Sequence, residues 1–195
     1  MTTVAHPTDG RAAVPGVSGP AGTLAGMTSV TPERPSLADV APAFVEIAHR
    51  IVWASVATVD ERGRPWTRVL HPLWEWDGTA LTGWVATSAT PAKVRHLGAH
   101  PNVAVSYWDP SQDTLYAHCA AALHTDEASR HRVWEAFKTA PEPVGYDPAI
   151  VPPWSGGPDT PGFAALRLDP WRLTVQPGAV LLQGRGDLAR TWAAP

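Results

Sequence analysis

The side chains best suited to chemistry in this sequence are two cations and two hydroxyls that stand close together along the chain. Arg68 lies in a β-rich stretch, T-R-V-L-H-P-L-W, and Thr87 and Ser88 end a second such stretch, W-V-A-T-S. Lys93 follows near the start of a short helical segment. A phosphate monoester is bound by this combination of positive charge, several hydrogen-bond donors and a nearby helix start. The pattern therefore predicts a phosphate site built by these four residues.

The elements that must position these side chains follow a polar tail and a helix. Residues 1–35 are rich in Gly, Pro, Ala, Ser and Thr and have no hydrophobic period, which predicts a disordered tail. A single domain is expected over residues 36–195. Its first helix is predicted to begin after Ser36 as N-cap, with Asp39 as capping-box partner, and to run to about His49.

Strands with tight turns are expected next. The sequence predicts a strand over residues 51–59, a partner strand over 64–76, and a hairpin turn at the Asp-Gly pair 77–78 that leads into a strand over 79–86. Pro72 lies inside the second strand and predicts a bulge or an edge position there.

A short helix is expected after the hydroxyl pair. It begins around Pro91, whose missing N–H costs little in a first turn, and it stops at His100-Pro101. Two further strands are predicted over residues 102–108 and 114–124.

The C-terminal part is expected to hold another helix, a long loop and more strands. The helix is opened by Thr125 or Asp126. The loop contains seven prolines and carries Trp154 near a Gly-Gly pair. The predicted ranges are 125–138 for the helix, 139–161 for the loop, and 163–168 and about 173–175 for the strands. Many hairpin-linked strands and few helices predict an α+β, mainly β protein, an antiparallel barrel with peripheral helices.

Composition excludes several classes of protein. The net charge of −3 and the absence of any Lys or Arg run argue against nucleic-acid binding. A single cysteine, Cys119, excludes an internal disulfide framework. No apolar stretch is long enough to span a bilayer, and the N-terminus lacks a signal-peptide pattern. We therefore expect a cytoplasmic protein without a membrane partner.

The order and spacing of these pieces resemble the flavin-binding split-barrel family of pyridoxamine 5'-phosphate oxidase-like proteins. That family carries an Arg with Val-Leu on one strand, a Thr-Asn or Thr-Ser at the end of the next, and then a Lys. Eight residues later comes an Asn-Pro or similar pair. Here Thr87 stands at the family threonine, and Lys93 and Pro101 keep the spacing. The resemblance covers roughly residues 37–125.

The resemblance implies an antiparallel split β-barrel of the FMN-binding type. It implies a homodimer with FMN at the subunit interface, and hydride or electron transfer to a small molecule through the flavin. The cofactor-binding residues that it implies are Arg68, Val69, Leu70, His71, Thr87, Ser88 and Lys93. Val69, Leu70 and His71 would contact the flavin ring. The phosphate would be bound by the remaining residues: Arg68, Thr87, Ser88 and Lys93. No catalytic residue is assigned, since His71 fits an acid–base role and a structural role at the Pro72 junction.

Other cofactors and functions stay open. The deazaflavin F420 would bind similarly, with its acidic tail in a basic groove formed by Arg62, Arg64, Arg68, Lys93 and Arg95. A non-catalytic stress protein that binds flavin or haem is a further alternative, as is a barrel that has lost its cofactor. Ala92 stands where the family's oxidase commonly has Arg, and the C-terminal part lacks that oxidase's Arg-x-His motif. The chain is therefore not expected to be that oxidase.

Metal binding and aromatic side chains complete the predictions. His96 and His100 are spaced like metal ligands, but no H-E-x-x-H motif is present and Pro101 ends the helix, so no metal site is expected. Four tryptophans are predicted to fill the core and a dimer contact, or to line a planar-ligand pocket: Trp66, Trp74, Trp76 and Trp84. The sequence leaves open whether the 139–161 loop closes over a ligand.

Overall fold

The computed structural model describes residues 34–195, so nearly all of the tail predicted over residues 1–35 lies outside the described part. The elements, in chain order, are α1 (Leu37–Ile51), β1 (Ala54–Val59), β2 (Pro65–Leu70), β3 (Leu73–Trp76), β4 (Leu81–Ser88), α2 (Pro91–Ala99), β5 (Asn102–Trp108), β6 (Thr114–His124), α3 (Glu127–Thr139), the 3-10 helices η1 (Pro148–Ile150) and η2 (Pro152–Trp154), β7 (Phe163–Gln176), α4 (Gly178–Leu182), η3 (Gly186–Leu188) and β8 (Arg190–Ala193).

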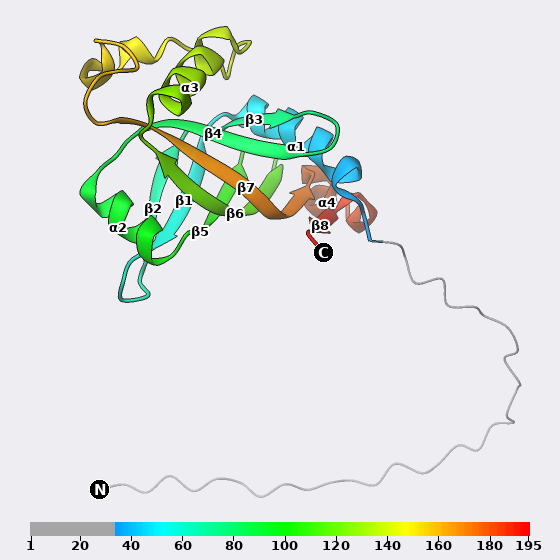
Figure 1. Ribbon diagram of the computed structural model, residues 1–195. Helices are drawn as coiled ribbons and strands as arrows, with labels where there is room; N and C mark the ends of the chain where they lie inside the picture. The colour runs from blue at the N-terminus through cyan, green and yellow to red at the C-terminus, as the bar shows by residue number, and fades with distance from the viewer. Residues whose placement is uncertain (1–33) are drawn as a thin grey trace, which may run out of the picture. The chain divides into compact units, whose positions relative to one another are not determined.

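The strands form one antiparallel sheet that curls into a barrel (Figure 1). Their order is β2-β1-β5-β6-β7-β4-β3, and β8 adds to β7. The helices lie around the barrel, with α2 near β1 and β6 and α3 near β4 and β7. The predicted mainly β, antiparallel barrel with peripheral helices is confirmed.

The first helix confirms its predicted cap and corrects the start of the first strand. Ser36 and Asp39 form the capping box. The helix continues to Ile51, which packs against the core, and Val52 ends it with a φ of 70°. The strand expected from residue 51 therefore begins three residues later, because the apolar face of the helix extends one more turn past Ile47.

The strand predicted over residues 64–76 is in fact two strands. β2 pairs with β1, whereas β3 pairs with β4, and the two stand at opposite ends of the strand order. The break falls at His71 and Pro72, since proline has no N–H to continue the ladder. Pro72 thus divides the strand and moves the chain to the other edge of the sheet.

The last long strand also differs from the prediction. The two strands expected over 163–168 and 173–175 are one strand, β7, which pairs with β4, β6 and β8. Pro170 lies opposite Cys119, where the register between β6 and β7 shifts. This irregularity accommodates a residue that cannot donate to the ladder.

The barrel interior is filled by aromatic and aliphatic side chains. The Phe44 ring meets the Trp74 ring edge to face at 5.1 Å between centroids. The indole Nε1 of Trp74 donates to the Tyr107 hydroxyl at 2.8 Å. A second apolar cluster, which includes Phe137 and Phe163, lies beneath α3 and the proline-rich segment of residues 139–161. These two clusters hold the strands that carry the predicted site.

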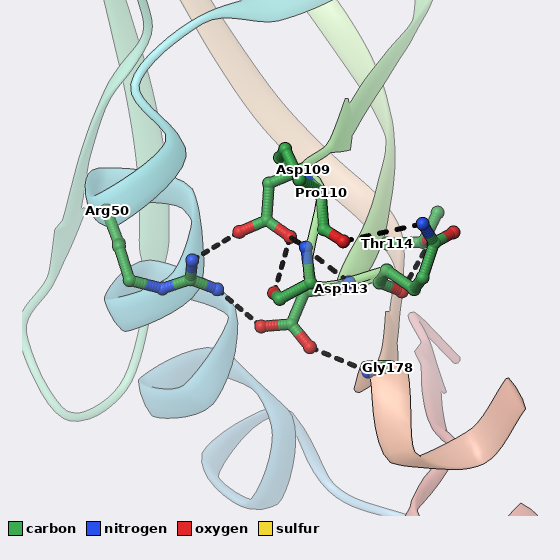
Figure 2. Close-up of polar contacts among 8 residues, drawn as sticks. Arg50, Asp109, Pro110, Asp113, Thr114 and Gly178 are labelled. Carbon is green, nitrogen blue, oxygen red and sulfur yellow. Dashed lines mark hydrogen bonds and ion pairs between the residues drawn. The ribbon is translucent and has the colours of Figure 1, made fainter. Parts of the chain in front are cut away.

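An ion-pair network joins α1 to the loop between β5 and β6 (Figure 2). Arg50 binds the carboxylates of Asp109 and Asp113. Asp113 Oδ1 also accepts a hydrogen bond from the backbone N–H of Gly178, the first residue of α4, at 2.6 Å. One loop therefore anchors elements from both ends of the described chain. Among the described residues, no helix is both long and apolar enough to cross a membrane.

Candidate functional site

Lys93 is the most unusual residue of the predicted phosphate site. It lies in the first turn of α2, which Thr90 caps, yet its side chain is only 6% exposed. Its ammonium donates to the Thr87 hydroxyl and, at 2.8 Å, to the backbone carbonyl of Ser88. Because an ammonium has three N–H donors, one remains for a further acceptor. The helix start and the end of β4 are therefore joined at this cation.

Arg68 adds a second positive charge to the same place. It pairs with Val56 across the β1–β2 ladder, so its side chain leaves the sheet on the face of the buried Val56. Burial, together with the charge of Arg68, lowers the pKa of Lys93 to about 8. Burial also lowers the pKa of Arg68.

No carboxylate within residues 34–195 forms an ion pair with Arg68 or Lys93. Two neighbouring cations withdrawn from water without a counter-charge are unfavourable, and an anion placed between them would relieve this cost. The group formed by Arg68, Lys93, Thr87 and Ser88 is called the polar corner below. Its electrostatics therefore suit an anionic ligand.

Ser88 and Thr87 complete the predicted polar set. The Ser88 hydroxyl oxygen accepts a hydrogen bond from the indole Nε1 of Trp154 at 3.2 Å. This contact occupies an acceptor position and leaves the hydroxyl proton of Ser88 to donate elsewhere. The structure thus brings together the four polar residues that the sequence singled out, and their role in binding phosphate stays a prediction.

An apolar pocket of about 550 Å³ lies next to this polar corner. Val69, Leu70 and His71, the residues predicted to contact a flavin ring, all line it. Its remaining lining residues come from the α1–β1 junction, β4 and the proline-rich segment: Ile51, Val52, Trp53, Ala86, Pro143, Tyr146, Ile150, Val151 and Trp154. The segment over residues 139–161 therefore forms one wall of the pocket, beside α3 in Figure 1.

His71 lies at the junction of β2 and β3, as the structural interpretation expects. Burial is the main reason that its pKa falls to about 4, so the imidazole is neutral near pH 7. The ring stacks on Tyr146 with 5.1 Å between centroids. Its Nε2 has no hydrogen-bond partner among the described residues.

Sequence reasoning missed two aromatic residues of the pocket, Trp53 and Tyr146, and left the role of Trp154 open. The four tryptophans that it assigned to the core and a dimer contact, or else to a pocket, are absent from the lining. Trp74 and Trp84 are core residues, and Trp66 is half exposed. The Gly-Gly pair near Trp154 was the only local signal, and it did not show which strand this indole would contact.

The basic groove proposed for an acidic cofactor tail is partly neutralised. Arg64 binds Asp60 at 2.7 Å between Nη2 and Oδ2. Arg95 approaches Glu61 at 3.4 Å between Nε and Oε1. His96, considered above as a metal ligand, contacts the Thr58 hydroxyl through Nδ1 at 3.0 Å. Within the described chain no three His, Cys, Asp or Glu residues are grouped to hold a metal ion.

Comparison with known proteins supplies a family for this geometry. The sequence matches the pyridoxamine 5'-phosphate oxidase family over residues 40–175. No curated protein matches it.

Solved structures of low sequence identity share its fold. A Clostridium acetobutylicum protein related to general stress protein 26 has a TM-score of 0.57 and 17% identity, and the match covers 76% of this chain and 89% of that one. A conserved hypothetical protein from Mycobacterium tuberculosis has a TM-score of 0.56 and 16% identity, with 72% and 86% covered. A pyridoxamine 5'-phosphate oxidase-related, FMN binding protein from Nostoc punctiforme has a TM-score of 0.54 and 18% identity, with 80% and 95% covered.

Proposed function

Because the chain belongs to the pyridoxamine 5'-phosphate oxidase family, we propose that it binds FMN and works as an FMN-dependent oxidoreductase. The observation that carries the proposal is the buried ammonium of Lys93 beside Arg68, with no ion-paired carboxylate in the described chain. The structural likeness to a Nostoc punctiforme protein described as FMN binding supports it. F420 is the less favoured cofactor, since Arg64 and Arg95 are already paired with acids.

The phosphate of FMN would be held by the polar corner. Arg68 offers a planar fork of donors, and Lys93 offers its remaining N–H. Ser88 contributes the hydroxyl proton that its contact with Trp154 leaves available. The start of α2 adds the partial positive charge of a helix N-terminus. Together these groups would supply positive charge and oriented hydrogen-bond donors for the phosphate dianion.

The flavin ring would lie along the end of β2, where Val69, Leu70 and His71 edge the apolar pocket. When bound, FMN would supply the hydride transfer. The walls of the pocket would keep water from the reacting face, and the neutral imidazole of His71 would add no charge to it.

We also propose that the protein is a homodimer, through one face of the sheet. Val69, Ser55, Ser106 and Tyr116 are register neighbours across β2, β1, β5 and β6, so they share that face. Val69 and Tyr116 are exposed large apolar side chains, as is Trp53 just before β1. A sheet face that combines small side chains with exposed aromatic and aliphatic groups suits an interface. Since Trp53 and Val69 also line the pocket, a second copy would close its mouth.

The proposal is tested by FMN binding. We expect the purified protein to show a flavin absorbance spectrum, or to bind added FMN with quenching of flavin fluorescence. The double variant Arg68→Ala/Lys93→Ala should weaken FMN binding by at least about a hundredfold, since two charge-assisted contacts are lost. Riboflavin, which lacks the phosphate, should bind both proteins with similar affinity.

Arg95→Ala is the matched control, because Arg95 lies on the same helix and is paired with Glu61. It should leave FMN affinity unchanged. Wild-type protein that binds F420 but not FMN would overturn the choice of cofactor. Equal loss of FMN and riboflavin affinity in the double variant would overturn the phosphate site.

A further inference from the structure

We propose that the apolar pocket admits a neutral, planar, mainly apolar molecule as the second ligand of the site, and that the proline-rich segment forms its selective wall. The pocket's place in catalysis rests on the FMN proposal. Its ligand class follows from the lining residues, whatever the cofactor.

The pocket has the size and surface of a site for a ring system. Its volume of about 550 Å³ falls within the range of small-molecule sites. Trp53, Tyr146 and Trp154 contribute aromatic rings, and Ile150 and Val151 contribute aliphatic surface away from the residues assigned to the flavin ring. Flat aromatic walls favour a planar ligand, which can stack on one ring and meet another edge to face.

The lining carries no full charge. Among the described residues that line the pocket there is no Lys, Arg, Asp or Glu. His71 is the titratable base of the lining, and burial keeps its pKa well below neutrality. Burial also raises the pKa of Tyr146 to about 12, so its phenol stays protonated. A charged ligand group would lose its hydration here without gaining an opposite charge.

Tyr146 offers the ligand a neutral polar contact. Its hydroxyl makes no hydrogen bond to any residue of the described chain, and its ring packs against the His71 and Phe137 rings, with 5.1 Å between centroids in each pair. A phenol fixed in this way can donate to a hydroxyl or carbonyl oxygen of an otherwise apolar molecule. The expected ligand therefore has rings and one or two neutral oxygens.

The wall formed by the proline-rich segment is attached at several points. The Trp154 indole is bound to Ser88 on β4 and packs edge to face on Phe163 at 5.2 Å. Further along, Asp159 contacts His131 of α3 at 2.9 Å between Oδ1 and Nε2. A wall anchored to both a strand and a helix can impose a shape on its ligand.

The two cations of the corner do not change this selectivity. Arg68 and Lys93 are absent from the pocket lining, and in the proposed complex both bind the cofactor phosphate. A second molecule with its own phosphate would find no unpaired cation among the lining residues. The pocket should therefore discriminate against phosphorylated ligands once FMN is bound.

A matched pair of ligands tests the inference. Isothermal titration calorimetry on FMN-saturated protein would compare 2-naphthol, neutral at pH 7.5, with 2-naphthyl phosphate, a dianion with the same rings. We expect 2-naphthol to bind at least about tenfold more tightly. The variant Ile150→Asp, at a position 71% exposed, should keep the fold and weaken 2-naphthol binding by about tenfold through the added carboxylate.

Leu181→Asp is the control, since Leu181 is 72% exposed, lies on α4 and is absent from the pocket lining. It should bind 2-naphthol as the wild type does. Equal affinity for the two ligands, or unchanged 2-naphthol affinity in Ile150→Asp, would overturn the inference. A protein that takes up no FMN would refute the FMN proposal alone, because the comparison of wild type with Ile150→Asp can then be made without cofactor.

Discussion

Lys93 illustrates how burial changes the chemistry of a lysine side chain. A lysine in the first turn of a short helix is usually solvated, and the helix dipole opposes it there. Here the ammonium is folded inward onto Thr87 and Ser88, beside Arg68. Its pKa of about 8 lies close enough to neutrality that the pH dependence of ligand affinity can test whether the ammonium binds an anion.

FMN affinity should depend on pH through Lys93. In the free protein Lys93 is mainly protonated below about pH 8 and loses its proton above it. A bound phosphate dianion favours the ammonium and raises the pKa, so binding above pH 8 requires proton uptake. We expect the dissociation constant to be constant between pH 7 and 7.5 and then to rise, by up to about tenfold per pH unit.

Fluorescence titrations of FMN between pH 7 and 9.5 would measure this dependence, with riboflavin as the control for titration of the flavin itself. The variant Lys93→Met should bind FMN weakly, with the pH dependence of riboflavin. Parallel profiles for FMN and riboflavin in the wild type would contradict a role for the Lys93 ammonium.

At the scale of elements, the packing of β4 against β3 is set by Gly83. A Cβ placed on Gly83 would come within 2.7 Å of the Trp74 ring, which is fixed by the Tyr107 hydroxyl and the Phe44 ring. The ring therefore cannot move away freely. The missing side chain leaves room for the Trp74 indole between the two strands.

Gly83→Ala should destabilise the protein by about 1–3 kcal/mol because it overpacks the core. Gly98→Ala is the matched control, because a Cβ there meets nothing within 4 Å and the residue lies in α2. It should stabilise the protein by up to about 1 kcal/mol through the higher helix propensity of alanine. Urea unfolding followed by circular dichroism would measure both, and equal effects would show that Trp74 does not restrict this position.

At the scale of the whole molecule, the open sheet face decides the proposed assembly. α1, α2 and α3 all pack on the barrel, yet Tyr116 remains 40% exposed at the β6 end of the row that crosses β2, β1, β5 and β6. A stable dimer commonly buries about 800 Å² on each partner. Trp53 and Trp108 lie beside this row and add exposed aromatic surface to the proposed interface.

Tyr116→Asp should shift the protein from dimer to monomer, since it replaces an exposed aromatic side chain of the proposed interface with a charge. Size-exclusion chromatography with light scattering would measure the mass, and Leu181→Asp is again the control. The monomeric variant should also bind FMN more weakly, because the pocket mouth loses its cover. A wild-type protein that elutes as a monomer would refute the proposed assembly.

Patterns confined to neighbouring residues were sufficient for much of the architecture. The capping box of Ser36 and Asp39 began α1 where expected, and period-2 alternation placed β5 and β6 at their observed bounds. These predictions succeeded because a cap, a strand period and a helix start are each decided within a few residues. That Arg68 would lie near Lys93 was instead implied by the family resemblance, because the two residues come from different elements.

Contacts between distant segments decided the rest. The Asp-Gly turn predicted that β3 pairs with β4, but no local pattern showed that the break at Pro72 places β2 and β3 at opposite ends of the strand order. The pocket wall also depends on a hydrogen bond between Trp154 and Ser88, 66 residues apart. The pairing of Arg95 with Glu61 likewise required the fold. Which tryptophan lines a pocket and which cation stays unpaired depend on positions in space, because burial and charge act through distance rather than sequence order.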